Sequence, residues 1–115
     1  KDHPFKSVSV THNLSEAIKG ADVVMALRLQ AERQSKGRLP SLREYSRLYG
    51  INKEILNLAN KKVIVMHPGP MNENVEINTE IAHGPHSVIQ EQVKNGVAVR
   101  MALLYTVAAA NRGGK

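Results

Sequence analysis

The chain has 115 residues, no cysteine and a formal net charge of +6, because 16 Lys and Arg stand against 10 Asp and Glu. This length is enough for one hydrophobic core and too short for two, and a chain without cysteine has no disulfide, no thiolate nucleophile and no cysteine-containing metal site. The positive charge favours anionic partners, but three tyrosines and one phenylalanine offer few rings for stacking on bases, so nucleic acid is not the expected partner.

No apolar run approaches the roughly 18 residues that a membrane-spanning helix needs. The segment that begins at Lys1 also lacks the ordered charged, apolar and small-residue regions of a signal peptide. We therefore expect a soluble, cytoplasmic protein without a membrane partner, and the absence of an initial Met indicates a fragment of a longer chain.

The first third of the chain predicts a strand, a short helix and a second strand. Residues 7–10 alternate polar and apolar side chains, as a short strand does. Asn13 is a candidate N-cap, and Gly20 can end the helix in a left-handed turn. In residues 21–27, the side chains after Asp22 are apolar at both odd and even positions. This pattern predicts a strand buried on both faces of a parallel sheet.

The middle of the chain predicts a loop followed by two helices. Residues 30–40 are polar and charged and contain breakers, a profile of an exposed and mobile loop. Ser41 caps a helix that Gly50 closes, and Asn52 caps a second helix that ends at Lys61 and Lys62.

The last part begins with an apolar strand over 63–66, which His67 and Pro68 end. Residues 71–85 have no sustained period and predict a long loop. Two helices, over 87–93 and 97–110, are expected to be separated by a break at Asn95 and Gly96, and residues 112–115 are expected to fray.

Strands that alternate with helices predict an α/β fold, with a parallel sheet in a Rossmann-like three-layer αβα arrangement that is incomplete in this chain and is followed by C-terminal helices. Ligands of such sheets bind beyond the carboxyl ends of the strands. We therefore expect the segments 28–30 and 67–70 to face one crevice.

Arg28 is a candidate carboxylate ligand, because its guanidinium is a planar and permanently charged fork. Gln30 lies two residues further on and so faces the same way. The alternative is a rim arginine in an ordinary salt bridge, which spacing alone favours.

His67 is a candidate general base, but a single histidine at the end of a buried strand is more often a hydrogen-bonded structural residue, and we favour that role. Pro68, Gly69 and Pro70 hold backbone carbonyls in fixed directions, which suits acceptance of N–H bonds from an amine or amide. The alternative for this segment is a rigid turn without a ligand.

No glycine-rich phosphate loop occurs, so no nucleotide cofactor is expected. His83 and His86 have no third ligand at a suitable spacing, so we expect two solvated histidines and no metal.

Taken in order, several segments resemble bacterial aspartate carbamoyltransferases. The match covers nearly the whole chain after about Asn13. Ornithine carbamoyltransferases resemble the chain less, since they carry a cysteine where Pro68 stands and a Ser-Met-Gly loop that this sequence lacks. The segments that carry the resemblance are 21–33, 66–72, 75–77, 87–89 and 92–102.

The resemblance implies that Arg28 and Gln30 bind L-aspartate and that the carbonyls of Pro68 and Gly69 orient its amine and the carbamoyl NH2. It also implies that Glu32 and Arg33 make ion pairs on domain closure, and that the region 37–50 moves over aspartate. The second substrate would be carbamoyl phosphate, with no cofactor and no metal.

The same resemblance implies a division of the chain. Residues 1–95 would be the C-terminal part of the L-aspartate-binding domain, and 96–115 a helix that packs back on a carbamoyl-phosphate domain. The family forms homotrimers, in some members with regulatory or dihydroorotase chains.

Two departures from the family restrict these expectations. The Ser-Thr-Arg-Thr phosphate loop and the upstream catalytic His are absent, so the chain alone should not catalyse. Glu73 and Asn74 stand where bacterial members usually have Arg-Gly, which reverses a charge near the site. A non-catalytic carbamoyltransferase-like interaction module is therefore the alternative to part of an active enzyme.

Overall fold

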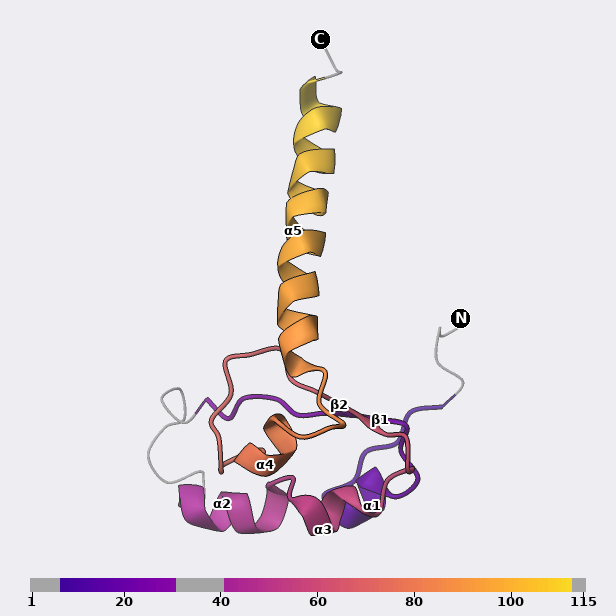
Figure 1. Ribbon diagram of the computed structural model, residues 1–115, viewed down its shortest axis with the longest axis vertical. Helices are drawn as coiled ribbons and strands as arrows, with labels where there is room; N and C mark the ends of the chain where they lie inside the picture. Colours follow the sequence, from indigo (N-terminus) through magenta and orange to yellow (C-terminus); the bar gives the residue numbers. More distant parts are fainter. Residues whose placement is uncertain (1–6, 31–40, 113–115) are drawn as a thin grey trace.

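The fold is an incomplete α/β unit from which one long helix projects (Figure 1). It is known from a computed structural model that describes residues 7–30 and 41–112. Its elements are α1 (Leu14–Ile18), β1 (Val23–Met25), α2 (Leu42–Tyr49), α3 (Lys53–Leu56), β2 (Ile64–Met66), α4 (Thr79–Ala82) and α5 (Ile89–Arg112).

The sheet is parallel, as the sequence predicts. Val23 pairs with Ile64, and Met25 pairs with Met66. A third segment runs beside β2, because the N–H of Val65 donates to the carbonyl of His86 at 2.8 Å and the N–H of Val88 donates to the carbonyl of Val65 at 3.0 Å. β2 therefore lies between β1 and the entry to α5.

Only one face of this sheet is buried by the described residues, so the prediction of a strand buried on both faces is wrong for β1. Val24 and Val65 point into the core with residues of α1, α3 and α4, whereas Val23 and Met25 are 49% and 51% exposed. In Figure 1, α1 to α4 lie on one side of the strands and α5 rises from the other. The face that carries Val23 and Met25 is apolar, as the sequence indicates, but none of the described helices covers it.

The starts of α1, α2 and α3 were predicted correctly because each depends on one local hydrogen bond. The side-chain oxygens of Asn13, Ser41 and Asn52 accept the backbone N–H three residues further on, at 3.3, 3.2 and 2.9 Å. Gly20 has the predicted left-handed conformation, with φ of +71°, in which glycine meets no Cβ penalty.

Several predicted boundaries are wrong. Residues 7–10 form no strand and are exposed. The second helix ends at Leu56, six residues early, because the chain then turns so that the carbonyl of Leu58 accepts the N–H of Gly20 at 2.9 Å. The long predicted loop contains α4.

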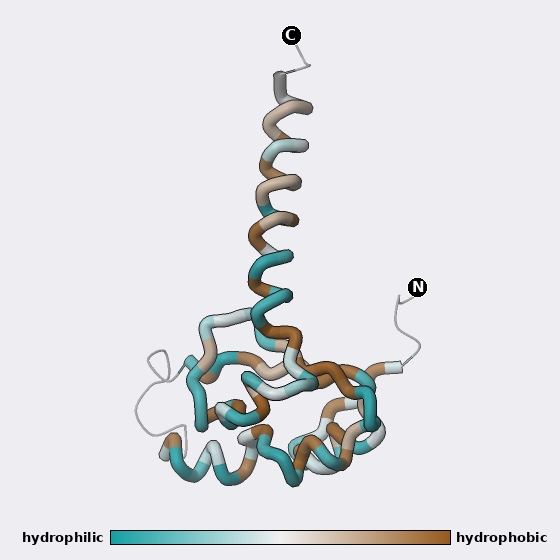
Figure 2. Tube along the Cα trace, in the orientation of Figure 1, coloured by the Kyte–Doolittle hydropathy of each residue, from teal (hydrophilic) through white to brown (hydrophobic). Residues whose placement is uncertain are grey.

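The break predicted at Gly96 is absent, since α5 runs from Ile89 to Arg112 as one helix. A single glycine costs about 1 kcal/mol in a helix interior, and the helix-favouring residues on both sides outweigh that cost. α5 therefore includes Arg112, which was expected to fray, while 113–115 and the predicted loop residues 31–40 lie outside the described residues. Figure 2 shows that apolar residues recur along this helix.

We predict that Asn52→Ala destabilises the protein by about 1 kcal/mol, because it removes the cap of α3. Asn57→Ala is the matched control, since Asn57 lies in helical geometry at the other end of α3 and the structure describes no side-chain hydrogen bond for it. Urea unfolding of the purified protein measures both, and equal losses in the two variants would contradict the assigned cap.

Candidate functional site

The two predicted edges lie at the same end of the sheet. The register that pairs Met25 with Met66 brings the residues that follow β1 beside those that follow β2, and the N–H of Ala26 donates to the carbonyl of Met66 at 3.0 Å. The segments 28–30 and 67–70 thus both lie at the carboxyl ends of the strands, where ligands of parallel sheets bind.

Arg28 and Gln30 are both exposed, and Leu29 between them is half-buried. This alternation is the one that the sequence predicts for two polar side chains on the same side of the chain. Glu32 and Arg33, the predicted closure residues, lie outside the described residues.

His67 is fully buried and is held by three hydrogen bonds. Its Nδ1 accepts the N–H of Gly69 at 2.9 Å, and its Nε2 lies 3.2 Å from Oε1 of Glu76. Its own backbone N–H donates to Oε1 of Gln92 at 3.0 Å. His67 therefore has the structural role that the sequence favoured and does not reach the solvent as a general base would.

The turn after His67 presents its carbonyls as a consequence of this anchoring. In a trans peptide the C=O and N–H point in opposite directions. Because the N–H of Gly69 points at the buried imidazole, the carbonyl of Pro68 points away from the core. Gly69 has φ of +68°, which a side chain would strain, and the Gly69–Pro70 peptide is cis.

Glu76 joins this turn to the loop that follows it. The carboxylate is 3% exposed, and its Oε1 also accepts the N–H of Asn72 at 2.6 Å, while Oε2 has no hydrogen-bond partner among the described residues. The side-chain amide of Asn72 donates to the carbonyl of Leu29 at 3.0 Å. One chain of hydrogen bonds thus connects the 67–70 turn with the 28–30 segment.

The same loop is tied to α2. The hydroxyl of Ser46 donates to the carbonyl of Asn74 at 2.8 Å. Burial raises the pKa of Tyr45, with smaller contributions from the nearby Glu76 carboxylate and from Tyr49. α2, which follows the region expected to move over aspartate, is therefore attached to the Glu76 loop.

The two residues that depart from the family pattern have local explanations. Asn74 has φ of +63°, a conformation that glycine and asparagine tolerate best, so asparagine can replace the family's usual glycine. The Glu73 carboxylate lies 3.2 Å from Nε2 of His83. Hydrogen bonds from Thr79 and His83 lower the pKa of Glu73, so part of its reversed charge is paired locally.

The prediction of two solvated histidines is correct for His83 only. His83 is about half exposed, whereas His86 is half-buried and its Nδ1 lies 3.0 Å from the carbonyl of Val63. Within residues 7–30 and 41–112, no three His, Cys, Asp or Glu side chains gather in a way that could hold a metal ion.

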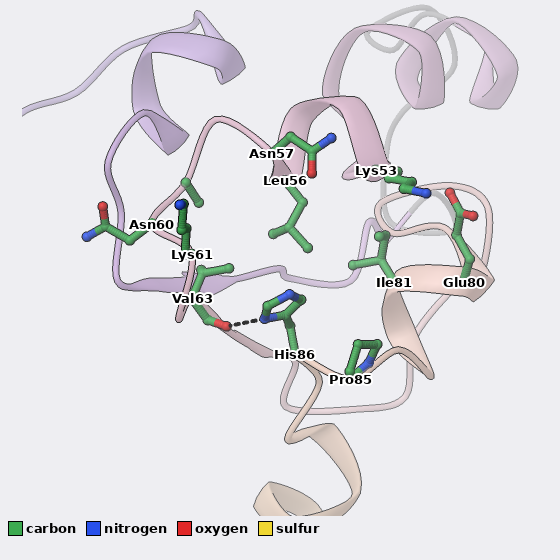
Figure 3. A pocket seen from close by; sticks show the side chains of 11 residues that line it. Lys53, Leu56, Asn57, Asn60, Lys61, Val63, Glu80, Ile81, Pro85 and His86 are labelled. Atoms are coloured by element: carbon green, nitrogen blue, oxygen red, sulfur yellow. Dashed lines mark hydrogen bonds between the residues drawn. The ribbon is translucent and has the colours of Figure 1, made fainter.

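Hollows lie at both ends of β2. A cavity of about 520 Å³ lies near its start, at the opposite end from His67, with Leu56, Val63 and Ile81 as apolar walls and His86 facing in (Figure 3). A groove of about 520 Å³ adjoins the predicted site, between Pro68, Pro70 and Val93. We place the candidate site at this end of β2, because the exposed Arg28 and the outward carbonyl of Pro68 both follow the carboxyl ends of the paired strands.

Sequence reasoning assigned no role to three polar residues that hold this site, the buried Glu76 and the half-buried Asn72 and Gln92. Asn72 and Gln92 bond to residues 43 and 25 positions away, whereas Glu76 bonds to Asn72 and His67 across an irregular loop. No periodic or capping pattern marks them. As for membranes, none of the helices that the structure describes is long and apolar enough to span one.

Comparison with known proteins identifies a family. The model of the family described as "Aspartate/ornithine carbamoyltransferase, Asp/Orn binding domain" matches residues 2–107. Catalytic subunits of aspartate carbamoyltransferase from Desulforamulus reducens and Desulfotalea psychrophila are 59% and 57% identical over 91% and 94% of the chain. The chain covers 34% of each, so it spans about a third of the length of these relatives.

Solved structures agree with this match. Aspartate transcarbamoylase from Trypanosoma cruzi, solved with phosphate, is 33% identical with a TM-score of 0.67, covering 83% of the chain and 29% of that protein. Ornithine carbamoyltransferase from Pyrococcus furiosus is 25% identical with a TM-score of 0.70, covering 81% of the chain and 29% of that protein.

We predict that Glu73→Gln makes stability less dependent on acidic pH. The folded-state pKa of Glu73 lies below its ordinary value of 4.5, so its ionised form stabilises the fold above that pH. This contribution is lost as the pH falls through the folded pKa. The urea midpoint should therefore fall less steeply below about pH 5 in the variant than in the wild type.

Glu54→Gln is the control for this measurement. It also removes an exposed carboxylate, but the structure describes no contact between Glu54 and a histidine. Parallel pH curves for wild type and Glu73→Gln would show that the carboxylate has no stabilising partner in solution.

Proposed function

This chain belongs to the aspartate/ornithine carbamoyltransferase family, and we propose that it forms the aspartate-binding side of an aspartate carbamoyltransferase. The observation that carries the proposal is the approach of the 28–30 segment to the 67–70 turn, joined by the hydrogen bond from Asn72 to Leu29. Further support comes from the curated relatives, which are named as aspartate rather than ornithine enzymes. Residues 1–95 would be the C-terminal part of the L-aspartate-binding domain.

The proposed reaction transfers a carbamoyl group to L-aspartate. The neutral amine attacks the carbonyl carbon of carbamoyl phosphate, a C–N bond forms, the C–O bond to phosphate breaks, and the amine loses a proton. The products are N-carbamoyl-L-aspartate and phosphate, as a step of pyrimidine biosynthesis. A structure of the Trypanosoma cruzi relative, 34% identical, is described as a complex with carbamoyl aspartate and phosphate.

Each predicted site residue has a role that its chemistry supports. Arg28 would hold a carboxylate of aspartate in a two-point contact, and Gln30 would add a neutral hydrogen bond. The carbonyls of Pro68 and Gly69 would accept N–H bonds from the amine and from the carbamoyl NH2. These contacts orient the two reactants, and the acceleration would come from positioning and from electrostatic stabilisation of the developing oxyanion.

The remainder of the enzyme would supply the phosphate-binding groups. The second half of α5 exposes large apolar side chains, among them Leu104 and Tyr105 at 72% and 78%, which supports packing of residues 96–115 on a carbamoyl-phosphate domain. Glu32 and Arg33 would form ion pairs when the two domains close. We propose a cytoplasmic homotrimer, to which regulatory or dihydroorotase chains would bind in some assemblies.

We predict that Arg28→Ala in the full-length protein lowers kcat/KM for aspartate by about 10- to 100-fold, mainly through KM, because a charged hydrogen-bonded contact is worth roughly 1.5–3 kcal/mol. The ureido product formed from carbamoyl phosphate and aspartate is measured by colorimetry.

Lys62→Ala is the matched control, since it removes one cation from the opposite end of the strands and should leave KM within about twofold. Full activity of Arg28→Ala would remove this residue from the site. A full-length wild type that forms no product would instead favour the non-catalytic interaction module.

A further inference from the structure

We infer that Glu76 is a positioning residue for the aspartate site, because through His67 and Asn72 it fixes the two edges of the crevice relative to each other. The inference rests on the proposed function and adds to it a residue that touches neither substrate.

One oxygen of Glu76 makes two contacts. Oε1 of Glu76 accepts the backbone N–H of Asn72 at 2.6 Å and faces Nε2 of His67 at 3.2 Å. The side chains of Glu76 and His67 are 3% and 0% exposed, so water does not compete for either bond, and both are stronger than they would be at the surface.

The contacts of the His67 ring determine its tautomer. The N–H of Gly69 donates to Nδ1 of His67 at 2.9 Å, so Nδ1 must carry a lone pair. The hydrogen of the neutral ring therefore lies on Nε2, where the Glu76 carboxylate accepts it. Glu76 and Gly69 thus require the same tautomer.

The His67 ring in turn fixes the direction of the Pro68 carbonyl. With its N–H fixed on the imidazole, the Pro68–Gly69 peptide cannot rotate, and the carbonyl of Pro68 is directed outward. If the imidazole turned, this carbonyl would turn with it. Glu76 therefore controls a proposed substrate contact that it does not itself make.

Glu76 is also linked, through Asn72, to the segment that contains Arg28. Asn72, whose N–H is bound by Glu76, donates its side-chain amide to the carbonyl of Leu29 at 3.0 Å, across 43 residues of sequence. Leu29 lies between Arg28 and Gln30. Both edges of the crevice are thus hydrogen-bonded, through one or two residues, to the same carboxylate oxygen.

The test compares variants of the full-length enzyme that keep or remove this acceptor. Glu76→Gln keeps an oxygen that can accept both bonds and puts nitrogen where Oε2 has no partner, so KM for aspartate should stay within about threefold. Glu76→Ala removes the acceptor and should raise KM for aspartate about 10- to 100-fold. KM for carbamoyl phosphate should rise much less than KM for aspartate, because its phosphate would be held by the remainder of the enzyme. Glu80→Gln, which changes an exposed acid four residues on, should match the wild type.

A merely structural role gives a different result, because partial unfolding lowers kcat and leaves KM for the folded fraction unchanged. That outcome in Glu76→Ala would overturn the inference. If Glu76→Ala does not fold, Asn72→Ala replaces it, since it removes only the side-chain bond to Leu29. A KM for aspartate unchanged in Asn72→Ala would equally overturn the inference.

A spectroscopic measurement separates this inference from the proposed function. The 15N NMR signals of His67, assigned by their loss in His67→Gln, should show a protonated Nε2 and an unprotonated Nδ1 at neutral pH. The opposite tautomer would overturn the inference even in a fully active enzyme. Absence of ureido product from the wild type would overturn the proposed function whatever the tautomer.

Discussion

The hydrogen bond between the imidazole of His67 and the carboxylate of Glu76 is the interaction on which the geometry of the site depends. Both groups are buried, so loss of either partner would leave a buried polar group unsatisfied, at a cost of about 1–3 kcal/mol. His67 directly follows β2, and β2 is fixed by its register with β1. The sheet thus places the histidine, and the histidine places both the Pro68 turn and the loop that contains Glu76.

The residues of the candidate site fall into two classes with opposite exposure. Arg28, Gln30 and Pro68 are exposed at the strand ends, where a substrate can reach them, whereas His67 and Glu76 are buried beneath them. Without a bound substrate, an exposed arginine on an unanchored segment would not keep one orientation. Buried hydrogen bonds below it keep the backbone that carries it in place, which is the form of preorganisation that catalysis by positioning requires.

The sequence predicted those parts of the fold that depend on neighbouring residues. The caps at Asn13, Ser41 and Asn52 each need one bond three residues away, and the apolar runs around Val24 and Val65 are continuous in the chain. The parallel sheet, and the position of both polar segments at one end of it, followed from these elements, and the resemblance supplied the proposed roles. The roles of Glu76 and Asn72 could not be found in this way. Asn72 bonds to a residue 43 positions away, and Glu76 lies in a loop that shows no period. The extent of α5 was misjudged because an Asn-Gly pair is a frequent turn signal whose cost a long helix can absorb.

The apolar surface of α5 bears on how the chain is used. Beyond Gly96 its exposed large side chains do not lie on one stripe, since Val97, Met101 and Leu104 follow one side while Val99, Leu103 and Val107 follow another. A helix that is apolar on several sides is normally buried on several sides. The free face of the sheet, with Val23 and Ile64 exposed, has the same requirement. Together with a length of about a third of the relatives, these surfaces favour a unit that completes its core only against further protein. The same packing would then bring the proposed carboxylate-binding edge close to the phosphate-binding groups proposed for the remainder of the enzyme.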